Sequence, residues 1–254
     1  MMLRLRLARL VRAASPALVV LAVWEVLALA GQSKTSVFPP PSTIVVTLLA
    51  NWQTFASDLQ PTLMEATLGF LIATAVALTL ASIFVRSAAI EQSLYNVAVT
   101  MHSIPLIAVV PILVIWFGNG STPKIAVAAL ASFFPILVNA TRGLRSIDQQ
   151  STELMHVLDA SWWQVFAKLR WPSALPYLFA AFKIGAPSAV LGAIIGEWIG
   201  SQTGIGYRIL TAMFNFDVNL LWATMVVSAL AALAGFTLFA VLERLTIGRW
   251  ERSA

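Results

Sequence analysis

Cysteine is absent from the 254 residues of this chain, and only two histidines occur. Without cysteine there is no disulfide framework, no thiol nucleophile and no thiolate ligand for a metal. The two histidines, His102 and His156, lie far apart and have no carboxylates at ligand spacing, so no metal site is expected. The phosphate-binding pattern G-x-x-x-x-G-K-[ST] is missing too, so the chain is not expected to bind ATP in the usual way.

Charge is scarce as well, because Asp, Glu, Lys and Arg make up 11% of the residues while hydrophobic residues make up 59%. This composition excludes an ordinary soluble domain and indicates an integral membrane protein. The basic residues are spread in small groups beside apolar runs, so no nucleic acid partner is expected. No Ser/His/Asp arrangement or carboxylate pair is evident, so the chain is not expected to be an enzyme.

Six apolar stretches are long enough to cross a bilayer, whose hydrocarbon core takes roughly 20 helical residues. They lie near residues 11–30, 62–85, 93–117, 124–141, 175–200 and 220–242. The sequence therefore predicts an all-α membrane protein with about six transmembrane helices in a single domain, 1–254. Arginines precede the first stretch as in a signal peptide, but no small-residue cleavage site follows residue 30, so this stretch is expected to remain as a span.

Lys and Arg are distributed unequally between the two sides of these spans. With the N-terminus inside, twelve basic residues fall in the inner segments and three, Lys34, Lys124 and Arg208, in the outer ones. Positive residues are enriched in cytoplasmic loops. We therefore expect both termini, and the loop between spans four and five, to be cytoplasmic.

The loop segment 146–172 is much less apolar than its flanks and carries two helix starts. Ser146 with Gln149 and Ser161 with Gln164 both fit the capping box, in which a hydroxyl and an amide side chain satisfy N–H groups at the helix start. The segment therefore predicts two short helices.

Asp159 falls between these two helices and tolerates a left-handed backbone, so a sharp break is expected there. Pro172 is expected to end the second helix, since proline lacks an N–H. Both helices carry apolar stripes, and Trp162 and Trp163 belong to the residue type most enriched among interface anchors. A hairpin on the membrane surface and a docking element for a soluble partner fit these features equally.

One set of residues in this loop has the spacing of a known signature. Glu153, then Asp159-Ala160-Ser161, then Pro172 and Pro176 resemble the cytoplasmic "EAA" signature of binding-protein-dependent ABC importer permeases. Leu154 and Met155 stand where that family usually has alanines, and Asp159 where it usually has glycine.

A longer likeness points to the nitrate/sulfonate/taurine branch of these permeases. It includes Trp116-Phe117-Gly118-Asn119-Gly120, Phe133-Phe134-Pro135, Gly196-Glu197-Trp198 and Gly204-Ile205-Gly206-Tyr207, and runs over about residues 39–248. The resemblance implies a translocation path for a small anion, such as nitrate, a sulfonate or taurine, or for a small heteroaromatic compound. It also implies a multi-pass protein of the bacterial inner membrane.

The resemblance further implies partners and a docking site. Segment 146–172 would be a coupling hairpin whose contacts with the ATPase come from Glu153, Asp159, Ala160, Ser161, Trp162, Pro172 and Pro176. Two ATP-binding subunits would hold ATP and Mg²⁺, so this chain would bind no cofactor. An extracytoplasmic binding protein would deliver substrate to a homodimer of the permease, surrounded by membrane lipid.

Polar residues inside spans are the candidates for the path, because charge at that depth costs at least a few kcal/mol and normally faces a cavity or a partner. We select His102, Asn139 and Glu197. His102 is equally explained as a packing residue, and Glu197 as a cap of the loop that follows it. Glu65 and Lys183 lie near span ends, where reaching toward the interface is a sufficient explanation.

Gly192, Gly196 and Gly200 recur every four residues and predict a close helix contact, either within one subunit or at a dimer seam.

Two other function classes fit parts of the sequence. A scaffold that only recruits a cytosolic partner fits the hairpin, and an ion-coupled secondary carrier fits the spans. Carriers usually show internal repeats and acidic groups at the bilayer midplane, and we find no repeat and few such acids.

Overall fold

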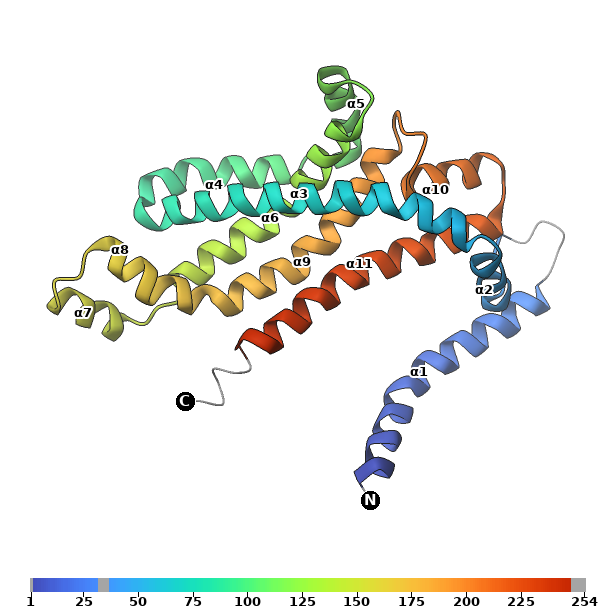
Figure 1. Cartoon of the computed structure of the whole chain (residues 1–254), viewed down its shortest axis with the longest axis horizontal. Coiled ribbons are helices and arrows are strands. Elements are labelled where there is room, and N and C mark those ends of the chain that lie inside the picture. Colours follow the sequence, from blue (N-terminus) through green and yellow to red (C-terminus); the bar gives the residue numbers. More distant parts are fainter. Residues whose placement is uncertain (1, 32–36, 248–254) are drawn as a thin grey trace. The chain divides into compact units, whose positions relative to one another are not determined.

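The computed structural model describes residues 2–31 and 37–247, with side chains from residue 15 onward. The described part of the chain contains helices and no strand, which confirms the all-α class (Figure 1). In order, the helices are α1 (Met2–Ala30), α2 (Pro41–Ala50), α3 (Trp52–Arg86), α4 (Ala88–His102), α5 (Leu106–Phe117), α6 (Ser121–Arg145), α7 (Gln149–Val157), α8 (Trp162–Val165), the π-helix η1 (Phe166–Arg170), α9 (Trp171–Glu197), α10 (Ile205–Phe214) and α11 (Val218–Thr246).

Four described helices are long and apolar enough to cross a membrane: α3, α6, the continuous α8–η1–α9 and α11. The third predicted stretch, 93–117, is not one straight span, because α4 and α5 meet at an angle of 97°. Pro105 stands at the start of α5 and has no N–H with which to continue the preceding helix. The described residues therefore contain four candidate spans, or five if the bent pair counts as one.

The first predicted stretch, 11–30, lies in α1, whose described apolar part is Ser15–Ala30. The side chains of residues 2–14, including the N-terminal arginines, lie outside the described residues. By contact, the chain divides into two compact units, residues 1–56 with 208–227 and residues 57–207 with 228–254.

In the first unit, α1 is tied to the start of α2 by a carboxylate. Glu25 accepts hydrogen bonds from the Ser42 N–H at 3.0 Å and from the Ser42 hydroxyl at 2.6 Å. Trp24, Phe38 and Trp222 pack against one another with ring centroids 5.3–5.4 Å apart. Tilted and edge-on aromatic pairs of this kind add to the apolar packing that holds the unit.

The second unit is built around α6 and α9, which pack closely along their length (Figure 1). A Cβ on Gly192 would lie 2.7 Å from the Ala128 Cα and 2.8 Å from the Ala131 Cβ, and one on Gly196 would lie 2.9 Å from the Lys124 Cα. Because these glycines already face α6 of the same chain, the predicted close contact lies within one subunit. Gly200 has φ +75° beyond the end of α9, so it serves a turn and not this helix face.

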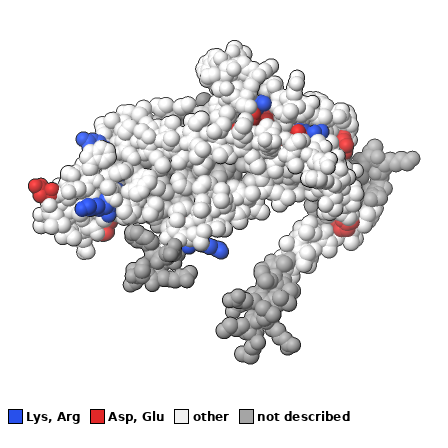
Figure 2. Space-filling view, viewed as in Figure 1, with Lys and Arg blue, Asp and Glu red and all other residues white. Residues whose placement is uncertain are grey.

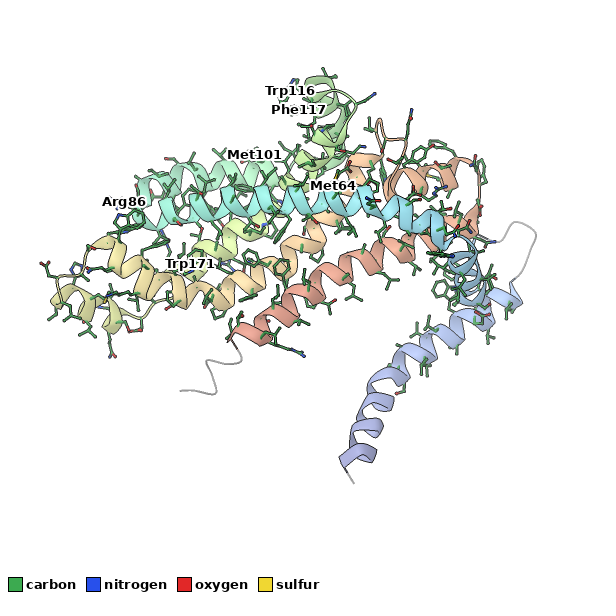
Figure 3. The ribbon with its side chains drawn as sticks, in the orientation of Figure 1. Met64, Arg86, Met101, Trp116, Phe117 and Trp171 are labelled. Carbon is green, nitrogen blue, oxygen red and sulfur yellow. The ribbon has the colours of Figure 1, made fainter. Side chains whose placement is uncertain are left out.

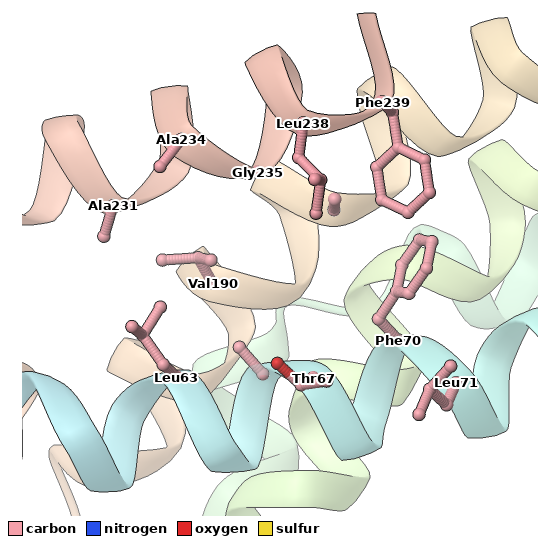
Figure 4. Close-up of a pocket in the computed structure, with 12 residues that line it drawn as sticks. Leu63, Thr67, Phe70, Leu71, Val190, Ala231, Ala234, Gly235, Leu238 and Phe239 are labelled. Carbon is pink, nitrogen blue, oxygen red and sulfur yellow. The ribbon is translucent and has the colours of Figure 1, made fainter. Parts of the chain in front are cut away.

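Beside α9, the inner faces of α3 and α11 enclose an apolar pocket of 340 Å³ (Figure 4). Phe70 and Phe239 lie near one end of it, with ring centroids 5.2 Å apart. Lys183 of α9 pairs with Glu243 of α11 at 2.7 Å. Reaching toward the interface is therefore not the explanation for Lys183, because its charge is matched within the bundle.

Helix α3 carries no charged residue between Glu65 and Arg86. On the face shown in Figure 2, charged side chains gather near α7 and α8, whereas the middle of α3 shows none. An uncharged middle is what the hydrocarbon core of a membrane requires.

The fit of Gly192 against α6 generates a prediction. Gly192→Ala should destabilise the protein by about 1–3 kcal/mol, because the added methyl group meets backbone and not a flexible side chain. The control is Gly235→Ala within α11, where the added carbon makes only ordinary contacts of 3.4 Å or more and the change should not destabilise the protein. Unfolding in detergent measures both variants, and equal stability of the two would show that α6 and α9 do not pack in this register.

Candidate functional site

The loop between α6 and α9 forms the predicted pair of short helices, but the first of them starts later than expected. Asp148, and not Ser146, caps α7: its carboxylate accepts the Ser151 N–H and the Ser151 hydroxyl, both at 2.7 Å. The Ser146 hydroxyl instead donates to the Gly143 carbonyl at the end of α6. The Ser151 N–H, followed by its hydroxyl, lowers the pKa of Asp148, so the cap persists at neutral pH and is lost only in acid, as the pH falls through that lowered pKa.

The corner between the two helices has the predicted geometry. Asp159 has φ +49°, in the left-handed region, which confirms the expected break. The Asp159 N–H donates to the His156 carbonyl and the Ala160 N–H to the Met155 carbonyl, each at 3.0 Å. These two bonds form a Schellman motif, which satisfies the last carbonyls of α7 and turns the chain sharply.

The second helix starts with the predicted capping box. The Ser161 hydroxyl accepts the Gln164 N–H at 3.4 Å, and the Gln164 side chain accepts the Ser161 N–H at 2.8 Å. Together with the Schellman motif, this fixes both sides of the corner at Ala160.

Apolar side chains project from this hairpin into solvent. Val157 is 83% exposed and Trp163 71% exposed, and Leu154 and Leu158 are also exposed. Glu153 lies on the exposed face of α7 and accepts a hydrogen bond from Gln149 at 2.8 Å. Exposed apolar residues with polar residues around them are typical of a surface that binds a partner.

Pro172 does not end the second helix, which is a correction to the sequence-based expectation. Helix α8 continues through η1, where the Trp171 N–H donates to the carbonyl of Phe166, five residues back, and α9 follows without a break. Pro172 therefore falls in the first turn of α9, where the missing N–H is tolerated. Pro176 lies within α9, so neither proline is part of the corner (Figure 3, Trp171).

The base of the hairpin is tied to the bundle by two arginines. Arg170 donates to the Leu144 carbonyl at 3.0 Å, and Arg145 forms an ion pair with Glu91 of α4. The guanidinium of Arg86, at the end of α3, lies 5.0 Å from the ring centroid of Trp162. Trp162 thus faces the bundle, whereas Trp163 faces solvent.

Among the path candidates, His102 and Asn139 take different positions. His102 ends α4 at the bend before α5 and stacks on Phe134 of α6, with centroids 4.4 Å apart and planes 15° apart. Both rings line a pocket of 180 Å³ that is otherwise mostly apolar. Asn139 does not line this pocket, and its amide donates to the Pro135 carbonyl at 2.8 Å.

Glu197 lies in a buried polar cluster at the end of α9. Its carboxylate accepts the Thr62 hydroxyl at 2.6 Å and the Gly206 N–H at 2.5 Å, and it is 1% exposed. Thr62 in turn accepts the Ile205 N–H at 2.9 Å. Glu197 therefore connects α3 to the loop before α10 and does not face an open path within this subunit.

Two more charged residues complete the cluster. Lys124 of α6 lies 3.5 Å from Glu65 of α3 and donates to the Ser201 hydroxyl at 2.9 Å. Glu65 is 1% exposed, so it does not reach for the interface as the sequence suggested. The sequence showed that polar and charged residues are few and lie near the ends of the spans. Residues 62, 65, 124 and 197 are far apart in the chain, however, so their spacing could not predict that they contact one another.

Comparisons with known proteins agree on one family. Residues 67–251 match the family described as "Binding-protein-dependent transport system inner membrane component". The chain is 33% identical over 91% of its length to the formylaminopyrimidine transport permease protein ThiX of Halalkalibacterium halodurans, and covers 92% of that protein. It is 30% identical over 92% of its length to the putative aliphatic sulfonates transport permease protein SsuC of Bacillus subtilis, and covers 86% of it.

A solved structure supports the fold. A chain of the MetNI methionine ABC transporter in an inward-facing conformation matches with a TM-score of 0.57 and 19% identity. The match covers 75% of this chain and 93% of that one.

The cluster around Lys124 generates a second prediction. Lys124→Met should destabilise the protein by about 3–5 kcal/mol, since it leaves Glu65 buried without its positive partner. Lys183→Met breaks the pair with Glu243, whose two side chains are 22% and 28% exposed, and should cost less than the loss of the buried pair. Thermal unfolding in the same detergent compares the two, and a smaller loss for Lys124→Met than for Lys183→Met would contradict the structural role of the cluster.

Proposed function

Because this chain belongs to the family of inner membrane components of binding-protein-dependent transport systems, we propose that its segment 146–172 is the site where an ATPase subunit docks. The chain is the permease subunit of an ABC importer in the inner membrane, it is not an enzyme, and ATP is hydrolysed in a separate subunit. The family membership decides against the ion-coupled carrier and the passive scaffold.

The exposed corner of the hairpin carries the docking proposal. Ala160 stands between a Schellman motif and a capping box, so its small side chain is presented at a fixed position. Val157, Leu158 and Trp163 surround it with exposed apolar surface. We assign contacts with the ATPase to this corner and to Glu153, Asp159, Ser161 and Trp162, while Pro172 and Pro176 start the span that receives the movement.

The family implies an ATPase and a binding protein as partners, and we propose a specific assembly. Two copies of this chain, each acting as one permease domain over 1–254, form a homodimer with the path at their seam. Two ATPase subunits hold ATP and Mg²⁺, and this chain binds no cofactor. Closure of the ATPase pair moves the two hairpins, and the path then faces the opposite side of the membrane.

Six spans per copy give this assembly its topology. We propose that α1, α3, the bent pair α4–α5, α6, α8–η1–α9 and α11 each cross the membrane once. Both termini and the hairpin are then cytoplasmic, in agreement with the twelve-to-three distribution of Lys and Arg.

For the substrate we favour a small planar heteroaromatic compound over an oxyanion. The pocket at the α4–α5 bend presents the stacked rings of His102 and Phe134, which suit a flat ring. Lys124 in the first turn of α6 and Lys183 in α9 are each paired with a carboxylate. Asn139 and Glu197 remain candidates for residues that line the path formed at the seam with the second copy. Thermal-shift screening of the cognate binding protein tests the choice, and stabilisation by sulfonates alone would reverse it.

Docking is tested at the corner itself. Ala160→Arg should prevent the ATPase from co-purifying, because bulk and charge would block the cleft that receives the corner. Ala88→Arg adds the same side chain to an exposed alanine outside the hairpin and should leave co-purification unchanged. Full retention of the ATPase by Ala160→Arg would show that the hairpin is not the docking site.

Asp159 gives a graded version of the same test. Asp159→Gly should preserve assembly and transport, because glycine adopts positive φ without strain. Asp159→Val should weaken both, since the left-handed conformation costs an ordinary residue roughly 1–2 kcal/mol and a β-branched side chain more.

Topology is tested by labelling single cysteines, against a chain that contains no natural cysteine. Gln150 in α7 and Gln202 after α9 are both exposed. A membrane-impermeant maleimide added to intact spheroplasts should label Gln202→Cys and not Gln150→Cys, while both should react after lysis. External labelling at residue 150 would contradict the cytoplasmic placement of the hairpin.

A further inference from the structure

A pocket of 490 Å³ opens where the end of α3 meets the hairpin. Arg86 lines it from α3, and Trp162, Trp163 and Phe166 line it from the start of the α8–η1–α9 span (Figure 3, Arg86). The pocket thus joins one arginine to a wall of aromatic rings. The docking proposal uses Trp162 and Trp163 but assigns no role to Arg86.

The depth of this pocket follows from the charges on α3. Twenty residues without charge separate Glu65 from Arg86. At a rise of about 1.5 Å per residue they span about 30 Å, which matches the hydrocarbon core of a bilayer. Arg86 therefore lies at the level of the lipid headgroups on the hairpin side, where Trp is enriched.

The guanidinium of Arg86 has no carboxylate partner among the described residues and is available to an anionic ligand. Within the described residues, no carboxylate lies at ion-pair distance from Arg86, and the nearby Glu91 pairs with Arg145. An arginine guanidinium matches the geometry of a phosphate group and forms paired charge-assisted hydrogen bonds with it.

Two hydroxyl groups give the pocket further polar character. Thr79 and Ser82 line it, and each donates its own proton to a backbone carbonyl of α3, at 2.8 Å in both cases. Their oxygens are therefore left to accept hydrogen bonds. A headgroup with hydroxyl donors next to its phosphate, such as a glycerol headgroup, satisfies both Arg86 and these oxygens.

An apolar stripe leads from the pocket toward the middle of the membrane. Ile72, Val76 and Ile83 share one face of α3 and are 51%, 47% and 38% exposed. Their spacing of four and seven residues places them in a row along the helix. A ligand with an anionic head and an apolar tail fits the pocket and the stripe together.

We propose that this pocket binds an anionic phospholipid of the cytoplasmic leaflet, with its phosphate on Arg86, its headgroup against Trp162 and an acyl chain along the stripe of α3. The bound lipid joins α3 to the hairpin. This inference depends on the proposed topology, because the pocket faces the anionic leaflet only if the hairpin is cytoplasmic.

The test uses the complex of the permease with its ATPase, exchanged into nanodiscs of phosphatidylcholine with phosphatidylglycerol and analysed by native mass spectrometry after release. Wild type should retain phosphatidylglycerol in preference to phosphatidylcholine. Arg86→Gln should lower that retention about tenfold, the effect of losing a hydrogen bond to a charged group. Arg244→Gln removes an exposed arginine from the last turn of α11, outside the pocket, and should retain lipid as wild type does.

Three outcomes would overturn the proposal: equal retention of the two lipids by wild type, equal losses from Arg86→Gln and Arg244→Gln, or loss of the ATPase from Arg86→Gln with lipid retention unchanged. The last would identify the pocket as a protein contact. Failure of the docking proposal is seen separately, because Ala160→Arg changes the corner and leaves the lipid pocket intact. The Ala160→Arg variant is compared with wild-type permease, both purified without the ATPase, and equal lipid retention by the two is the expected result.

Discussion

The close approach of α6 and α9 is the constraint on which the second unit depends. Gly192 and Gly196 bring the two backbones together at one end, and Gly143 does so at the other, where an added Cβ would lie 2.7 Å from that of Tyr177. Without a hydrophobic effect between helices in lipid, this kind of dense packing is the main attraction available. The pair therefore forms a stiff support with the hairpin at one end and the buried polar cluster at the other.

The two ends of this support solve opposite physical problems. At the cluster, Lys124 and Glu65 are buried and pair with each other, and the buried Glu197 is satisfied by Thr62 and Gly206, because an unpaired buried charge is very costly. At the hairpin, Val157 and Trp163 are apolar and exposed, and the cost is offset when a partner covers them. The polar cluster is thus satisfied by contacts within the chain, whereas the hairpin exposes a surface for contact with a partner.

The continuous helix from Trp162 to Glu197 connects these ends mechanically. Its 36 residues include the π-turn that accommodates Pro172, so the second hairpin helix is the beginning of a span and not a separate element. A force on the Ala160 corner is therefore delivered to α9 without an intervening loop. Arg86 above Trp162 adds α3 to the same connection.

Local features could be predicted from the sequence. The all-α class, the break at Asp159 and the capping box at Ser161 depend on residues close together in the chain, and composition alone required a membrane. Other features depend on which helices become neighbours. Pro172 continues a helix because a π-turn precedes it, Glu197 is a buried tie because Thr62 and Gly206 fold onto it, and Gly192 faces α6 and not a second subunit. Such pairings join residues far apart in sequence, and a single sequence carries no record of them, because their energy arises only when the tertiary packing brings the groups together.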